Sequence, residues 1–512
     1  MKWYFVFISF LVGLLSLGEE IVWVRIVSFL GHSVPQSFSF VLFCYISGIA
    51  IGALLGPKLL RTKLSPLLII SNLLLFSAVL VLAAPWIIKY FTNSFFLVFI
   101  TAFLIFACAG FKGAIFPLVH HWFSLPGENL GRTLSWVYCA NLLGSAMGPL
   151  LVGFWLLDAY SMFSALELLG SIELTSGISI LLFSVSSFLK HIAAVVCLII
   201  STVVCALLFS ESKNVLKTVI AEGFPEHEKI SHVIENRHGV IFTLSNGKDL
   251  ADAVYGGNVY DGSFNIDLVK NTNKIDRAYI LAALQPQPRR ALFIGLSSAS
   301  WLRVVSAMPG VENIDVVEIN KGYSTLVNQY PGANDIFNDR RINFFYTDGR
   351  QLVQKAINEN KKYDLIVMNN TWHWRIYSTN LLSIEFMGML KKVMNKGAVT
   401  TFNSTDSLDV VFTAKNVFDK VYMYRNFVYV SDRNLSQSLV EYKDRLCSLS
   451  AARVDGQNCG QPAYHSATQS LSSVHLLEWE EIPKAWLNGR SAEVITDDNM
   501  ITEYRFGSGF SM

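Results

Sequence analysis

The chain has 512 residues, of which 52% are hydrophobic and only 16% charged, and its mean hydropathy is +0.40. This composition excludes a purely soluble protein, because soluble domains carry about 25% charged residues. The net charge of +2, with no basic stripe, argues against nucleic acid as a partner. Seven cysteines without a CxxC pair or a short-range His/Cys ligand spacing predict neither a metal site nor a disulfide framework.

Residues 1–210 are dominated by apolar runs long enough to cross a bilayer. They predict an integral membrane domain with about six or seven helical spans. Glu19, Glu20 and Arg25 follow the first run without a small-residue cleavage site, so it is not a cleaved signal peptide. We therefore expect contact with the lipid bilayer of the inner or cell membrane, with runs near 3–24, 38–57, 66–88, 94–117, 134–157, 168–187 and 191–210.

The orientation follows from the loop charges. Lys58, Arg61 and Lys63 lie between the second and third runs, which predicts that this loop and the N-terminus are cytoplasmic. A domain that uses a cytosolic nucleotide cofactor belongs in the same compartment, so we expect an even number of crossings and a cytoplasmic C-terminal domain. The run 168–187, rich in Ser and Gly, is the weakest span.

Two features of the apolar half have alternative interpretations. Glu19 and Glu20 lie near the end of the first run, where they are either solvated at the interface or part of an ion or substrate path. Small residues recur in "SGIAIGALLG" (47–56) and "GSAMGPLLVG" (144–153), a spacing that lets helices approach closely. We expect the glycines to serve packing.

The remainder has ordinary soluble composition. Residues 211–228 form a charged connector, and 229–288 contain β-leaning segments with Gly and Asn-Gly turn signals, which predict a small β subdomain. Strands and helices then alternate over 289–435, which predicts a Rossmann-like α/β domain with a doubly wound parallel sheet. Residues 436–512 follow as a C-terminal extension.

Ligands of such sheets bind beyond the carboxyl ends of the strands. The first strand, "RRALFIG", ends at Gly295, the second, "IDVVEIN", at Glu318, and the third, "INFFYTDGR", at Asp348. Glycine lets the backbone approach a ligand, and Glu318, about twenty residues further on, is placed to accept hydrogen bonds from two ribose hydroxyls. Asp348 is placed near an adenine amine, although an acid at a strand end is commonly a helix N-cap. We predict a nucleoside cofactor site made of Gly295, Ser297, Glu318, Asp348 and Gly349.

The stretch "ALFIG…VVEIN…YTDGR…YDLIVMNN…LLSIEFMGMLKKVMNKGAV" resembles the spermidine synthase (polyamine aminopropyltransferase) family over about residues 230–435. The apolar half and the segment "TDDNMITEYRFG" are similar to the membrane-bound, transporter-fused branch of that family. The resemblance implies a class I methyltransferase-type fold. It also implies decarboxylated S-adenosylmethionine as co-substrate and transfer of its aminopropyl group to a small amine. A homodimer is one possible oligomeric state.

The chain departs from the family pattern where the chemistry needs acids. The glycine-rich loop appears as "GLSSAS", with Ser298 at the place of its acid, and the Tyr-His-Glu stretch is matched only at Tyr279. The fourth strand ends in "NNTWH", so Asn369 stands where the resemblance implies a proton-accepting carboxylate, and an amide is no base at neutral pH. Around the acceptor we predict Asn369, Tyr279 and His373 as catalytic residues, and Asn370, Thr371 and Trp372 as substrate-binding residues.

Three routes to activity remain open. His373 could serve as the base, the acceptor could arrive neutral, or unmodified S-adenosylmethionine could donate a methyl group. Trp372 offers an aromatic face to a cationic substrate. We therefore expect a transferase that acts on an amine. The alternatives are an S-adenosylmethionine-dependent methyltransferase and a catalytically silent adenosyl-ligand sensor coupled to a membrane transporter.

Overall fold

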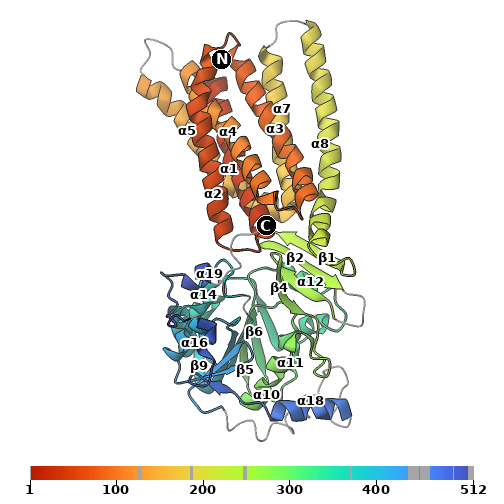
Figure 1. The fold of residues 1–512 in the computed structure, drawn as a ribbon, viewed down its shortest axis with the longest axis vertical. Coiled ribbons are helices and arrows are strands. Elements are labelled where there is room, and N and C mark those ends of the chain that lie inside the picture. Colours follow the sequence, from red (N-terminus) through yellow and green to blue (C-terminus); the bar gives the residue numbers. More distant parts are fainter. Residues whose placement is uncertain are drawn as a thin grey trace. The chain divides into compact units, whose positions relative to one another are not determined.

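The fold was obtained as a computed structural model (Figure 1), which describes residues 2–123, 130–184, 188–245, 251–369, 372–435, 449, 462–487 and 489–505. The chain divides into two compact units. The first is helical and runs to Glu226, and the second is an α/β unit that begins at His227; the short segment Glu235–Val240 groups with the first.

Seven helices of the first unit are long and apolar enough to cross a membrane, among the residues that the structure describes. Met162–Ser184, which includes most of the run predicted as the weakest span, is one of them. Residues 211–222, predicted as part of a connector, continue the last helix. The long helices are α1 (Lys2–Leu30), α2 (Gln36–Leu55), α3 (Pro66–Phe91), α4 (Leu97–Phe123), α5 (Leu130–Leu151), α7 (Met162–Ser184) and α8 (Phe188–Glu222).

Glycines bring these helices together in pairs. A Cβ on Gly52 of α2 would lie 2.0 Å from the carbonyl oxygen of Gly110 in α4, and one on Gly144 of α5 would lie 2.0 Å from that of Phe10 in α1. No real Cβ fits at such distances, so the small residues are required for close backbone contact. The packing interpretation of both glycine-rich stretches is confirmed.

The α/β unit begins with a four-stranded sheet in the order β1 (Lys229–Asn236), β2 (Gly239–Ser245), β3 (Ala253–Gly256) and β4 (Val259–Ser263). β2 and β3 pair antiparallel, as do β3 and β4. The short helices α9 (Asp276–Tyr279) and α10 (Leu281–Leu284) follow before the second sheet begins.

The second sheet has eight strands in the order β12-β10-β11-β9-β8-β5-β6-β7. Its strands are β5 (Arg290–Ile294), β6 (Asn313–Val317), β7 (Ile342–Phe345), β8 (Tyr363–Met368), β9 (Met394–Asn403), β10 (Lys420–Tyr424), β11 (Phe427–Ser431) and β12 (Leu477–Glu478). β5 to β9 pair in parallel, whereas β10, β11 and β12 pair antiparallel. The predicted Rossmann-like fold class is confirmed, but the sheet is mixed rather than wholly parallel.

Both faces of this sheet are buried, which explains why its strands are apolar runs without alternation. Ala291 and Phe293 of β5 belong to one hydrophobic cluster, and Leu292 and Ile294 to a second one. The covering helices include α11 (Ser300–Ser306), α12 (Gly322–Val327), α13 (Gly349–Asn358), α15 (Ile384–Val393) and α16 (Leu408–Lys415).

Parts of the predicted C-terminal extension are integrated into the α/β unit. Strand β12 joins the sheet edge, and the Ile495 N–H donates to Thr413 Oγ1 of α16 at 2.9 Å. The buried carboxylate of Glu503 in α19 (Ile501–Arg505) accepts hydrogen bonds from the backbone N–H groups of Tyr377 and Thr379 at 3.1 and 2.8 Å. Residues of α19 therefore support the loop that follows β8.

Candidate functional site

The strand order creates a crevice at the carboxyl ends of β5 and β8. The chain continues from β5 to β6 on one side of β5, whereas β8 lies on its other side. The strand order therefore reverses between β5 and β8, and ligands of such sheets bind at this switch point. The Gly295 N–H donates to Val317 O and the Asn369 N–H to Ile294 O, both at 2.9 Å. Gly295, Glu318 and Asn369 thus lie at the ends of three adjacent strands.

Gly295 is required by this geometry. Its φ is +91°, and a Cβ there would lie 2.8 Å from the backbone oxygen of Asn369. The serines that follow anchor the loop to strand β4. Ser297 Oγ donates to Asp261 O at 2.8 Å, and Ser298 Oγ donates to Ser263 O at 2.7 Å. Ser298, at the place of the family's acid, therefore has a backbone partner in the small sheet.

Glu318 is buried and holds the same loop. Its Oε2 accepts from the Leu296 N–H and its Oε1 from the Asn320 N–H, both at 2.8 Å. Burial raises the pKa of Glu318 to about 7, against the opposing effect of these two hydrogen bonds. Ile319 beside it is 54% exposed, which leaves an apolar surface next to the carboxylate.

Asp348 caps a helix. Its Oδ1 accepts from the Arg350 N–H at 2.9 Å and the Gln351 N–H at 3.1 Å at the start of α13. This is the common role of an acid at a strand end. Gly349 permits close packing, because a Cβ there would lie 2.8 Å from Ile294 Cγ2.

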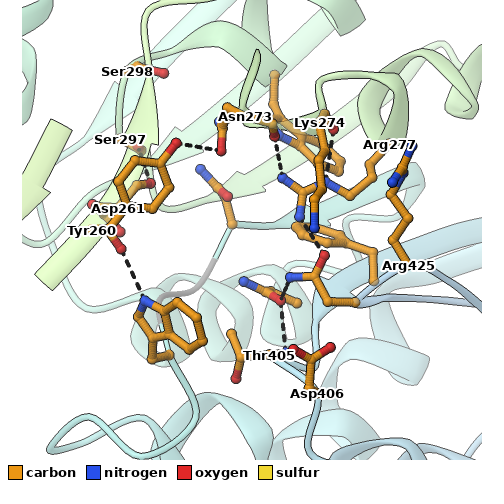
Figure 2. Close-up of a pocket in the computed structure, with 16 residues that line it drawn as sticks. Tyr260, Asp261, Asn273, Lys274, Arg277, Ser297, Ser298, Thr405, Asp406 and Arg425 are labelled. Carbon is orange, nitrogen blue, oxygen red and sulfur yellow. Dashed lines mark hydrogen bonds between the residues drawn. The ribbon is translucent and has the colours of Figure 1, made fainter. Parts of the chain in front are cut away.

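A cavity of about 580 Å³ lies beside the Gly295 loop (Figure 2). Of the predicted site residues, Ser297, Asn369 and Trp372 line it. Trp372 Nε1 donates to Tyr260 O at 3.2 Å, and its ring stacks on Trp374 with centroids 6.0 Å apart. Asn370 and Thr371 lie outside the described residues.

His373 and Tyr279 are not among the residues that line the cavity. His373 is 5% exposed and lies behind Thr405, whose Oγ1 accepts its backbone N–H at 2.9 Å. Burial lowers the pKa of His373 to about 4, so its imidazole is neutral and weakly basic at pH 7. Tyr279 is fully buried, and its hydroxyl donates to Ile266 O at 2.8 Å.

The sequence analysis missed Asp261, which lines the cavity from strand β4. Its Oδ2 accepts from the Tyr323 hydroxyl at 2.6 Å. Burial raises the pKa of Asp261, while the nearby Arg375 and the Tyr323 hydrogen bond oppose the rise. A carboxylate with a raised pKa holds a proton more readily, so Asp261 supplies basic character that Asn369 lacks.

Three cations lie across the cavity from Asp261 (Figure 2), namely Lys274, Arg277 and Arg425. The Arg277 guanidinium lies 4.6 Å from the centroid of the Phe427 ring, and Nη1 donates to Asn426 Oδ1 at 2.7 Å. Arg425 pairs with Asp276 at 2.8 Å. Asp261 therefore lines the cavity near the Gly295 loop, and the three cations, of which Arg425 already pairs with Asp276, line the opposite side.

One further acid was within reach of sequence reasoning. Asp406 lines the cavity and follows β9, the fifth parallel strand, whose carboxyl end lies at the same sheet edge as those of β5 and β8. The sequence-based prediction considered the ends of the first four strands only. Asp261, by contrast, lies in a segment whose Asp-Gly pair indicated only a turn. Among the described residues, no group of three or more His, Cys, Asp or Glu side chains is arranged to hold a metal ion.

Comparison with known proteins identifies the C-terminal part. Residues 278–430 match the spermine/spermidine synthase domain. The polyamine aminopropyltransferase of Clostridium beijerinckii is 30% identical over 122 residues, 24% of this chain and 42% of that protein. That of Alkaliphilus oremlandii is 32% identical over 94 residues, 18% of this chain and 32% of that protein. The chain thus spans less than half the length of these curated relatives.

Solved structures with a similar fold include a spermidine synthase in complex with the transition state analogue AdoDATO and the spermidine synthase of Thermotoga maritima. Both are 14% identical and cover 48% of this chain, with TM-scores of 0.38 and 0.36. This chain covers 86% and 85% of those two chains, respectively. The family match confirms the resemblance to the spermidine synthase family over residues 278–430.

Proposed function

We propose that the spermine/spermidine synthase domain of this chain transfers an aminopropyl group from decarboxylated S-adenosylmethionine to an amine acceptor. The observation that carries this proposal is the arrangement at one sheet edge. Gly295 and Glu318 lie beside a cavity of about 580 Å³ that Asp261, Asn369 and Trp372 line. The adenosyl donor would lie at the first two residues and the acceptor in the cavity.

Glu318 suits the ribose of the donor. Each carboxylate oxygen accepts one backbone N–H and keeps a second lone pair for a ribose hydroxyl. The two N–H bonds fix the orientation of the carboxylate before the ligand arrives. The exposed face of Ile319 offers an apolar surface for the adenine ring.

The transfer requires a neutral amine and an acceptor for its proton. The amine nitrogen attacks the aminopropyl methylene carbon that is bonded to the sulfonium sulfur. The bond between this carbon and sulfur breaks, and its electron pair goes to sulfur, so methylthioadenosine is the leaving group. The attacking nitrogen loses one proton. We assign that proton to Asp261, because its carboxylate lines the cavity and burial raises its pKa. Asn369 would then orient the amine through its amide oxygen.

The charges of the cavity indicate the class of acceptor. A diamine would place a second cation at the end where Lys274, Arg277 and Arg425 lie (Figure 2). An amine with a carboxylate at its far end would instead place opposite charges together. We therefore propose an amino acid-like acceptor, with its amine near Asp261 and its carboxylate near Arg277.

A matched pair of acceptors tests this proposal. The full-length protein is incubated with decarboxylated S-adenosylmethionine and either putrescine or 4-aminobutyrate, which has a carboxylate in place of one aminomethyl group of putrescine. Mass spectrometry should show addition of one aminopropyl unit to 4-aminobutyrate, and Asp261→Asn should abolish it. Asn369→Asp in the Asp261→Asn background should recover part of the turnover, because it returns a carboxylate to the cavity. A preference for putrescine would refute the acceptor class.

Parallel incubations with S-adenosylmethionine, together with calorimetry, separate the alternatives. Addition of a methyl group from S-adenosylmethionine would indicate a methyltransferase instead. Calorimetric binding of the adenosyl ligand without any product would indicate a ligand sensor. No binding of either adenosyl compound would exclude Glu318 and the Gly295 loop as a cofactor site.

We further propose that the seven apolar helices attach this domain to the inner or cell membrane with the α/β unit in the cytoplasm. The support is their length and composition, together with Lys58, Arg61 and Lys63 in the loop after α2. An even number of crossings then requires one of the seven helices not to cross. Reporter fusions at the ends of the successive helices test this topology, and an exported C-terminal reporter would contradict it.

A further inference from the structure

A cluster of three buried charged side chains lies inside the helical unit. Lys112 of α4 donates from Nζ to Glu19 Oε2 of α1 at 2.6 Å, and the same nitrogen lies 3.5 Å from Glu173 Oε1 of α7. It also donates to Ser77 Oγ of α3 at 3.1 Å. All four side chains are at most 1% exposed. The interpretation of Glu19 as a solvated interfacial carboxylate is therefore wrong, and four helices meet at this cluster.

The charges of the cluster do not balance when all three groups are ionised. Two carboxylates face one ammonium, and the ion pairs that the described residues make with Glu19 and Glu173 both come from Lys112. The neighbouring Tyr45 and Cys108 are neutral side-chain types at pH 7 and add no compensating charge. An uncompensated buried charge costs several kcal/mol, so the cluster is stable with one additional positive charge.

Glu173 is the group suited to carry that charge as a proton. Glu19 has the shorter contact with Lys112, since Nζ lies 2.6 Å from Glu19 Oε2 and 3.5 Å from Glu173 Oε1. Glu173 also lies within hydrogen-bonding reach of Glu19, whose Oε1 has no other hydrogen-bond partner in the described part of the chain. A protonated Glu173 would donate to that oxygen. Two adjacent carboxyl groups that share one proton are a known arrangement in proteins.

The cluster connects helix pairs that are otherwise tightly packed. α1 contacts α5, and α2 contacts α4, at glycines where the backbones touch, while α7 packs on α3 at Gly170 and Gly177. Lys112, Glu19 and Glu173 belong to three different pairs. Loss of a proton from Glu173 would change the forces between these pairs. Glu167, also buried and six residues earlier on α7, provides another carboxyl about 9 Å along the helix axis.

We propose that the Glu19–Lys112–Glu173 cluster is a proton-binding site of the helical unit, with Glu173 as the group that takes up and releases the proton. The proposal is independent of the aminopropyl transfer assigned to the α/β unit.

Infrared difference spectroscopy of the full-length protein in lipid nanodiscs tests the site. The carbonyl stretch of a protonated carboxyl group is compared between the wild type and charge variants at pH 7. The spectrum of the wild type minus that of Glu173→Gln should show one such band, because protonated carboxyls elsewhere, such as that of Glu318, contribute equally to both proteins. Glu19→Gln should also remove it, because Glu173 then ionises as the partner of Lys112. Lys112→Met should double it, because neither carboxyl keeps a counterion.

Controls assign the signal and separate proton from metal cation. Glu20→Gln, which changes the partly exposed neighbour of Glu19, should leave the band unchanged, and Glu167→Gln identifies any band from the second carboxyl of α7. Glu173→Gln mimics the protonated side chain and should fold, which its elution and thermal stability check. A carboxyl band of unchanged intensity in Glu173→Gln would overturn the proposal. Loss of the band when Na⁺ replaces choline at constant pH would overturn the proposal, because it would mean that the site binds a metal cation in place of the proton.

Discussion

Replacement of Glu318 by Gln should remove a specific pH dependence of stability. The Glu318 carboxyl is buried, and burial raises its pKa from the ordinary 4.5 to about 7 despite the two backbone N–H groups that bind it. Because the folded-state pKa is raised, the stability linked to this group is fully present below pH 4.5. It is lost as the pH rises through 7.

The size of the effect follows from the pKa. A rise of about 2.5 in pKa, at 1.36 kcal/mol for each unit, corresponds to a decrease of about 3 kcal/mol in the free energy of unfolding between pH 4.5 and pH 8. Glutamine does not titrate, so the difference in unfolding free energy between wild type and Glu318→Gln should shift by about this amount across the same range. The wild type should be favoured at the acidic end.

Denaturant unfolding at a series of pH values measures this difference, with Glu312→Gln as control. Glu312 is an exposed carboxylate that pairs with Arg289 on the surface, where ion pairs contribute little. Its variant should follow the wild-type pH profile. Parallel profiles for the wild type and Glu318→Gln would refute the reasoning, because they would mean that Glu318 titrates alike in the folded and unfolded chain.

Three further predictions follow from single contacts. Gly295→Ala should abolish adenosyl-ligand binding in calorimetry. Gly295 has a φ of +91°, and the added Cβ would lie 2.8 Å from a backbone oxygen at the end of β8. The control Gly388→Ala, at a position where nothing lies within 4 Å of an added Cβ, should bind the ligand normally. Asp348→Ala should lower the unfolding free energy by about 1 kcal/mol, because α13 loses its N-cap. Asp348→Asn should keep most of this stabilisation, since asparagine also caps helices. Equal losses of stability in the two variants would contradict a capping role. Glu503→Gln should speed hydrogen exchange in the loop after β8, because one of two N–H groups loses its acceptor; unchanged exchange would show that the loop is held by other contacts.

The parallel strands were predictable because burial on both faces leaves a simple pattern. β5, β6 and β8 are short apolar runs, and each is followed by a residue with a conformational or polar role. Gly295 and Glu318 could be located in this way, since the carboxyl ends of parallel strands meet at one edge of a sheet. The antiparallel strands β10 to β12 gave no comparable signal, because their place depends on successive pairing, of β11 with β9, β10 with β11 and β12 with β10, and not on their own composition.

The roles that the sequence did not reveal depend on distant partners. Asp261 acquires its environment from Tyr323, 62 positions away, and Glu19 pairs with Lys112, 93 positions away. His373 has the side chain expected of a base, but burial behind Thr405 lowers its pKa to about 4. Burial and pairing at such separations arise only when the tertiary structure forms, so residue type and spacing could not predict them.

The amide at Asn369 does not by itself imply an inactive site. Aminopropyl transfer requires a proton acceptor near the amine, and that requirement concerns a position in space, not a particular strand. Two of the walls of the cavity are formed by the strand ends of the large sheet and by β4 of the small sheet. Asp261 reaches the same cavity from the second wall, where burial strengthens its affinity for a proton. A lost carboxylate on one wall is therefore compatible with catalysis when the opposite wall supplies another.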